Sequence, residues 1–199
     1  MPRSDFDILS RAQNGEQELF GELMVRYADR FLRVAESKLG DRASAEDVVQ
    51  ETFLAAFAAR TSYNRQFAVS TWLWTILLNR CRARWKRRRQ RPWEDASAYT
   101  ETSCGSVPQA GASALARLIS QEESELLHRL LDELPEPQAD ALRLRFFGGL
   151  KFDEIAVAME SSLCGAKRRV KTGLQTLSQR IHSLEHPATS PGRPTEDHP

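Results

Sequence analysis

One stretch of the chain combines aromatic, amide and basic side chains in an order that suits contact with nucleic acid. Tyr63, Asn64 and Phe67 lie just ahead of an apolar run. Eight of the twelve residues from Arg80 to Arg91 are Lys or Arg, and none of the twelve is acidic. Aromatic rings stack on unpaired bases, and a row of cations can hold the phosphates of the same strand. The same pattern also fits a core helix with a solvated basic end, a calmodulin-binding helix or a membrane-surface helix.

Helices are predicted to position this stretch. Between its aromatic and basic parts, Trp72, Leu73, Ile76 and Leu77 recur at i, i+1, i+4 and i+5, which places them on one face of a helix. The basic residues continue that helix. The aromatic residues are therefore expected in the loop before the helix, and the cations along its second half.

Three further helices are predicted upstream. Ser4 is a candidate N-cap for a short first helix, and Gly40 is expected to end the second helix as a C-terminal glycine. The third helix is predicted over residues 41–60. Apart from the proline at position 2, no proline precedes Pro92, so the N-terminal half is predicted to be entirely helical.

The third predicted helix carries a polar face. Glu46, Asp47, Gln50 and Glu51 are spaced at i, i+1, i+4 and i+5, so they lie together. Ordinary solvation explains such a face, and so does a docking surface for a basic partner.

Residues 92–114 are rich in Ser, Ala, Thr, Gly and Pro and show no period, which predicts a flexible linker. Helical spacing resumes at Leu115. After Gly149 the chain is predicted to form a helix, a tight turn and a second helix from Leu163 to Ile181. The second helix contains no acid and has four cations near its start, where a helix-turn-helix meets base edges in the major groove. A helical hairpin with no role in DNA binding is the alternative.

The composition narrows the class of protein. The 199 residues are 41% hydrophobic and 28% charged with a net charge of +1, which predicts a soluble globular protein. Three widely spaced cysteines favour a reducing cytoplasm over a disulfide framework or a zinc site. No apolar run has membrane-spanning length. The four histidines (His128, His182, His186 and His198) show no ligand spacing and no nucleophile constellation is present, so no enzyme activity, metal or cofactor is predicted.

Two longer strings resemble one protein family. AEDVVQETF, with GELMVRYADRFLRVA before it and TWLWTILLNRCRARWKRR after it, resembles domain two of the extracytoplasmic-function (ECF) sigma factors of bacterial RNA polymerase. LPEPQADALRLRFFGGLKFDEIAVAM resembles domain four of the same family. Glu160 and Ser161 stand where that family has Gly followed by an aliphatic residue.

The resemblance implies roles for particular residues. The polar face of the third helix would bind the clamp helices of the largest polymerase subunit, through Glu46, Asp47, Gln50 and Glu51. The loop and basic helix of domain two would capture a base of the downstream promoter element and hold its strand, through Tyr63, Asn64, Arg65, Phe67, Asn79, Arg80, Arg84, Arg87 and Arg88. The helix-turn-helix of domain four would read the upstream element, through Ser162, Lys167, Arg168, Arg169, Lys171 and Thr172.

The sequence thus predicts an all-α protein of two small helical domains. Domain two is expected over residues 1–91, the linker over 92–114, domain four over 115–182 and a disordered tail over 183–199. The predicted function is that of a cytoplasmic sigma factor, which directs core RNA polymerase to promoters and promotes strand opening. Core polymerase, promoter DNA and an anti-sigma factor are the expected partners, with no membrane. The alternative is a one-component helix-turn-helix regulator whose N-terminal helices dimerise or bind an effector.

Overall fold

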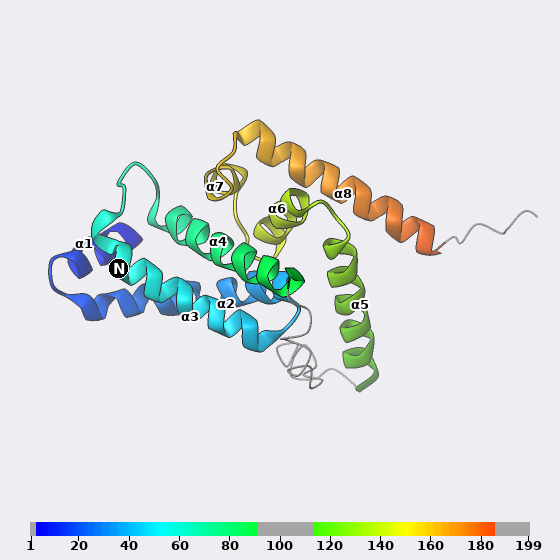
Figure 1. Ribbon diagram of the computed structural model, residues 1–199, viewed down its shortest axis with the longest axis horizontal. Coiled ribbons are helices and arrows are strands. Elements are labelled where there is room, and N and C mark those ends of the chain that lie inside the picture. The colour runs from blue at the N-terminus through cyan, green and yellow to red at the C-terminus, as the bar shows by residue number, and fades with distance from the viewer. Residues whose placement is uncertain (1–2, 91–113, 186–199) are drawn as a thin grey trace, which may run out of the picture.

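The structure, a computed structural model, describes residues 3–90 and 114–185, with side chains for residues 3–90 and 122–184. Every regular element in these ranges is helical, which confirms the predicted all-α class (Figure 1). The predicted linker lies outside the described residues except for Ala114, and so does the predicted tail from residue 186 onward. The last helix continues to Glu185, three residues beyond the point at which the tail was expected to begin.

Eight α-helices and two short 3-10 turns make up the described part of the chain. In chain order these are α1 (Asp5–Gln13), η1 (Gln17–Leu19), α2 (Phe20–Leu39), α3 (Arg42–Ala59), η2 (Arg60–Ser62), α4 (Val69–Gln90), α5 (Ala114–Asp132), α6 (Glu136–Phe146), α7 (Phe152–Ala158) and α8 (Leu163–Glu185).

The predicted caps begin and end the first helices. The Ser4 hydroxyl accepts a hydrogen bond from the Asp7 amide at 3.1 Å, and the Asp41 carboxylate caps α3 in the same way. Gly40 ends α2 with a φ of 76°, a left-handed conformation that glycine adopts without steric cost. Local sequence therefore sets these boundaries.

The N-terminal half is a bundle in which α2, α3 and α4 surround an aromatic core. The ring centroids of Phe31 and Trp74 are 4.5 Å apart, and those of Phe31 and Phe53 are 5.4 Å apart. Trp74 is only 1% exposed, whereas Trp72 is half-buried and packs on Tyr63 outside this cluster. Trp74 is thus the core tryptophan of α4. The sequence had instead predicted Trp72 on the buried apolar face of this helix.

In the C-terminal half, α6 and α7 pack against α8. Gly173 allows the close approach of α8 to α6, because a Cβ atom there would lie 2.9 Å from a methyl carbon of Leu142. The first and second helices of the predicted helix-turn-helix are α7 and α8.

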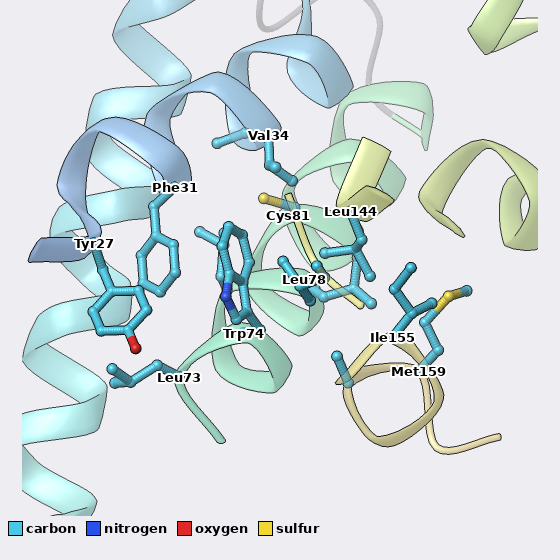
Figure 2. Close-up of a cluster of buried hydrophobic side chains, with 14 of the residues drawn as sticks. Tyr27, Phe31, Val34, Leu73, Trp74, Leu78, Cys81, Leu144, Ile155 and Met159 are labelled. Atoms are coloured by element: carbon cyan, nitrogen blue, oxygen red, sulfur yellow. The ribbon is translucent and has the colours of Figure 1, made fainter. Parts of the chain in front are cut away.

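The two halves share one continuous core. Side chains of α2 and α4 meet those of α6 and α7, with Trp74 and Leu78 facing Leu144 and Ile155 (Figure 2). A Cβ atom on Gly148 would lie 2.7 Å from the backbone oxygen of Leu144 and 3.2 Å from the Trp74 ring, so a larger residue does not fit here without a shift of the backbone. The described parts of the two halves are therefore closely packed.

A buried ionic network also crosses this interface. Asp140 of α6 is fully buried, and its carboxylate lies 2.6 Å from the Lys38 ammonium of α2 and 2.8 Å from Nε of Arg82 of α4. The buried Arg143 guanidinium lies 3.9 Å from the same carboxylate and donates to the backbone carbonyl of Ser37 at 3.1 Å. Because the buried Asp140 of α6 needs the cations of α2 and α4 to compensate its charge, this network ties the halves together.

Candidate polymerase and nucleic-acid interfaces

The predicted polymerase-binding face is present on α3. Glu46, Asp47 and Gln50 are exposed, and Glu51 is half-buried beside them. The opposite face of the helix, including Val48 and Thr52, is buried in the N-terminal bundle, which turns the polar face outward. The geometry therefore offers a basic partner an accessible surface of carboxylates and one amide.

Two carboxylates of this face pair with the neighbouring basic helix. Asp47 lies 3.3 Å from the Arg84 guanidinium, and Glu51 lies 3.6 Å from that of Arg80. Both pairs join α3 to α4, so the predicted polymerase-binding and DNA-binding residues partly neutralise one another.

The rest of the basic half of α4 is partly committed in the same way. Arg88 lies 3.1 Å from Asp41 and donates to the Leu39 carbonyl at 2.5 Å. Arg87 and Asn79 are exposed. The basic half thus offers a mixture of solvated and paired cations.

A hollow of roughly 360 Å³ lies where the predicted base-capturing loop meets the start of α4. Tyr63, Arg65, Gln66 and Phe67 line it, together with the first residues of α4 and two residues of α1. Its walls combine aromatic rings, a guanidinium and an amide, which are groups that can stack on a flat base and hydrogen-bond to its edge.

Internal hydrogen bonds hold the loop in shape. The Tyr63 hydroxyl donates to the carbonyl of Phe67, and the backbone N–H of Gln66 donates to the Asn64 side-chain oxygen at 3.0 Å. Asn64 therefore stabilises the turn and does not line the hollow, whereas Gln66, absent from the predicted set, does line it. Asn in a turn commonly binds its own backbone two residues on, a signal that could have redirected the prediction to Gln66.

The loop and the basic half of α4 are well separated. Arg80 lies eleven residues after Val69, the first residue of α4, and Arg88 lies nineteen residues after it. These separations correspond to about 16 Å and about 28 Å along the helix axis. A strand bound by both regions would have to run along α4.

The start of α8 presents cations to solvent. Lys167, Arg168 and Lys171 are exposed on one face of the helix. Arg169 is half-buried, and one of its guanidinium nitrogens is buried without a hydrogen-bond partner. Thr172 is half-buried as well. Of these predicted DNA-contacting residues, Lys167, Arg168 and Lys171 are therefore accessible to a ligand, whereas Arg169 and Thr172 are partly covered by the protein.

The turn before α8 is shaped by two residues. The Ser162 hydroxyl accepts a hydrogen bond from the Gly165 amide at 3.0 Å, so this predicted DNA contact is an N-cap here. Glu160 has a φ of 49°, the left-handed conformation that favours glycine. The family that this part of the sequence resembles has glycine at this position.

A larger hollow of roughly 490 Å³ lies at the seam between the halves. Lys38 and Arg143 line it, but both belong to the buried ionic network, and Arg89 stacks on Trp85 at 4.6 Å. This hollow therefore belongs to the packing between the halves.

Two further features bear on the class of protein. Among the residues that the structure describes, no cluster of three His, Cys, Asp or Glu could hold a metal ion. Within the same residues, none of the helices combines the length and the apolar character needed to cross a bilayer.

Comparisons with known proteins place these features in a family. Residues 23–91 match the family Sigma-70 region 2, and residues 124–177 match Sigma-70, region 4. The RNA polymerase sigma-H factor of Pseudomonas aeruginosa is 26% identical over 186 residues, covering 90% of this chain and 95% of that protein. The ECF RNA polymerase sigma-E factor of Escherichia coli K12 is 26% identical over 184 residues, covering 91% of this chain and 96% of that protein.

Two solved structures share the fold. CnrH, solved in complex with the cytosolic domain of CnrY, gives a TM-score of 0.66 at 22% identity, with 88% of this chain and 96% of that chain covered. The sigma factor RpoE from Bartonella quintana, solved with the anti-sigma factor NepR, gives 0.60 at 22% identity, with 82% and 96% covered. With both sigma regions present in the order that the resemblance implied, this chain belongs to the sigma-70 family, and within it to the ECF sigma factors.

Proposed function

We propose that this sigma factor binds core RNA polymerase through α3, directs it to promoters through α8, and promotes strand opening through the loop before α4. Domain two would comprise residues 1–91 and domain four residues 115–182, joined by the linker at 92–114. The protein would act in the cytoplasm, without catalysis of its own, where polymerase and DNA are found.

The aromatic hollow beside Tyr63 and Phe67 is the observation that carries this proposal. A regulator that only binds duplex DNA has no use for an open pocket lined by rings, an amide and a guanidinium. Each captured base contributes about 1–3 kcal/mol of stacking. That is comparable to the loss of one base-pair step, about 1.4 kcal/mol, so capturing one or two bases biases opening without fuel.

The polar face of α3 supports the polymerase-docking part of the proposal. Its carboxylates are accessible, and their partners within the chain are surface arginines, which a basic protein surface can replace. The names of the relatives, both RNA polymerase sigma factors, point to the same partner. An anti-sigma protein is proposed as a further partner, because the structure from Bartonella quintana contains one.

The test is co-purification of the full chain with core RNA polymerase. We expect Asp47→Arg combined with Glu51→Arg to abolish association, because like charge then faces the basic partner. The matched control is Glu18→Arg with Asp29→Arg, which makes the same charge change at exposed positions away from this face. Circular dichroism verifies that both variants keep their helical content.

Wild-type yield of core polymerase with the α3 variant would contradict the docking assignment. Failure of the wild-type chain to bind core polymerase at all, together with tight binding to duplex DNA by the chain alone, would favour the one-component regulator.

A further inference from the structure

The hollow beside the base-capturing loop has a wall that lies outside the matched sigma region. Region 2 begins at residue 23, yet Asp5 and Phe6 of α1 line the hollow together with Gln66 and Phe67 of the loop. The N-terminal helix therefore lines a hollow whose other walls lie within the matched region.

Helix α1 is firmly attached at this point. Ile8, Leu9 and Ala12 are buried against the bundle. The Asp5 carboxylate accepts a hydrogen bond from the Tyr27 hydroxyl and pairs with Arg26 of α2. The backbone of α1 is thereby fixed, and Phe6 is held at the rim of the hollow.

Phe6 nevertheless remains 46% exposed, as does Phe67 of the loop. The Arg65 guanidinium lies 5.2 Å from the centroid of the Phe6 ring. Two half-exposed aromatic rings and a cation thus line one small hollow. Stacking a flat ligand on these rings would remove apolar surface from water.

We propose that Phe6 forms a stacking wall of the base-capture pocket and that Gln66 reads the edge of the captured base. This inference rests on the proposed function, because it needs a base extruded from the opened promoter. It adds a helix and two residues to the site predicted from the sequence.

Gln66 is suited to the reading role by elimination within the hollow. The Asp5 carboxylate is committed to Arg26 and Tyr27, and the Asn64 side-chain oxygen is committed to the turn. The Gln66 side chain is exposed and carries both a donor and an acceptor, as a base edge requires, and its oxygen accepts only a long hydrogen bond of 3.5 Å from the Asn64 side-chain amide, which a base edge can replace.

Loss of the Phe6 ring has a predictable size. Alanine substitution of a base-stacking ring weakens binding by an amount that corresponds to about 5- to 150-fold. Phe6→Tyr keeps the ring and should retain binding, whereas Phe6→Ala should lose it.

The experiment uses the full chain assembled with core RNA polymerase. The probe is a pool of forked DNA whose single-stranded non-template segment is random, and the bound molecules are sequenced. We expect Phe6→Ala and Gln66→Ala to flatten the base preference at one and the same position, and the other preferred positions to be retained. Phe146→Ala is the matched control, since that phenylalanine is 61% exposed and lies in α6 away from the hollow.

The outcomes separate this inference from the proposed function. If the wild-type complex selects no sequence, the proposed function fails. If it selects a motif that Phe6→Ala leaves intact at every position, with unchanged affinity, the wall assignment is overturned. A general loss of binding by Phe6→Ala that Phe6→Tyr does not restore would also overturn it, because the effect would then come from the fold of α1.

Discussion

Two helices of this sigma factor carry dense positive charge, and they hold it differently. In α4, four arginines lie within 3.6 Å of carboxylates of the chain, namely Arg80, Arg82, Arg84 and Arg88. At the start of α8, Lys167, Arg168 and Lys171 are exposed, and none of them forms an ion pair with an acid in the part of the chain that the structure describes. The α8 cations can meet phosphates directly, whereas these four arginines of α4 must first exchange a carboxylate.

The cost of that exchange differs along α4. The pairs of Arg80 and Arg84 are on the surface, where an ion pair contributes about 0–1 kcal/mol, so a phosphate can replace the carboxylate. Arg82 instead pairs with the fully buried Asp140 of α6. We infer an order of events from this difference. Helix α8 binds closed duplex first, and α4 binds a single strand after polymerase has bound the carboxylates of α3 and released the arginines of α4.

The largest expected effect concerns the buried pair. Asp140→Ala should lower the free energy of unfolding by up to about 3–5 kcal/mol, because Lys38 and Arg143 lose their shared buried carboxylate and keep only the more exposed carboxylates of Glu136 and Asp132. Urea unfolding measures the change. The matched control is Glu133→Ala, which breaks the exposed pair with Arg180 of α8 and should cost at most about 1 kcal/mol.

A cysteine under the same interface reports whether the halves separate. Burial is the main cause that raises the pKa of the Cys81 thiol to about 12, so this thiol stays protonated and shielded in the folded chain. Iodoacetamide should label the exposed Cys164 quickly and Cys81 slowly. Equal unfolding losses for Asp140→Ala and Glu133→Ala, with no faster labelling of Cys81 in the former, would contradict a structural role for the network.

The next effect distinguishes two neighbours on α8. Arg168→Ala should weaken binding of the polymerase complex to closed promoter duplex by about 1–3 kcal/mol if Arg168 contacts a base. Arg169→Ala should instead act mainly on stability, because its guanidinium is partly buried. Gel-shift titration on duplex and thermal melting separate the two results. If Arg169→Ala weakened duplex binding and Arg168→Ala lowered stability instead, α8 would enter the groove with a different face.

A smaller effect tests the pairing between α3 and α4. Asp47→Asn releases Arg84 from its ion pair, so Arg84 can contact one more phosphate of non-specific duplex. The plot of log binding constant against log salt concentration for the free chain should then be steeper by about one unit. The control, Glu16→Gln, releases Arg11 of α1 with the same change of net charge and should leave the slope unchanged. Identical slopes for Asp47→Asn and the wild type would mean that Arg84 is already available.

The smallest effect concerns the turn that sets the start of α8. Glu160→Gly removes a left-handed strain of about 1–2 kcal/mol at the cost of about 0.5–1 kcal/mol of glycine entropy. A net gain of about 0–1.5 kcal/mol in unfolding free energy is expected, measured by urea titration. A loss of stability would show that the Glu160 side chain contributes more than its backbone costs.

Local signals were enough to predict much of this fold. The Ser4 cap, the Gly40 end of α2 and the polar face of α3 depend on residues a few positions apart, and the structure has each of them. The exposed cations of α8 were predicted for the same reason.

The remaining features depend on contacts between distant segments. Asp140 stands among other charged residues of α6, and its burial depends on Lys38, about a hundred residues earlier. Phe6 lines the hollow only because α1 packs beside the loop. Trp74 could have been found, since it shares a helical face with Leu78 and Cys81, but that face competes with the one through Trp72.

The most direct test of the account compares opening with duplex binding in the assembled polymerase complex. Tyr63→Ala with Gln66→Ala, both residues of the hollow, should leave closed-duplex binding nearly unchanged and reduce permanganate reactivity of thymines at the opened promoter. Arg168→Ala should weaken closed-duplex binding, and a pre-melted promoter should restore transcription to the loop variant only in part. Equal losses of closed-duplex binding in both variants would contradict the division of labour between the loop of α4 and the start of α8.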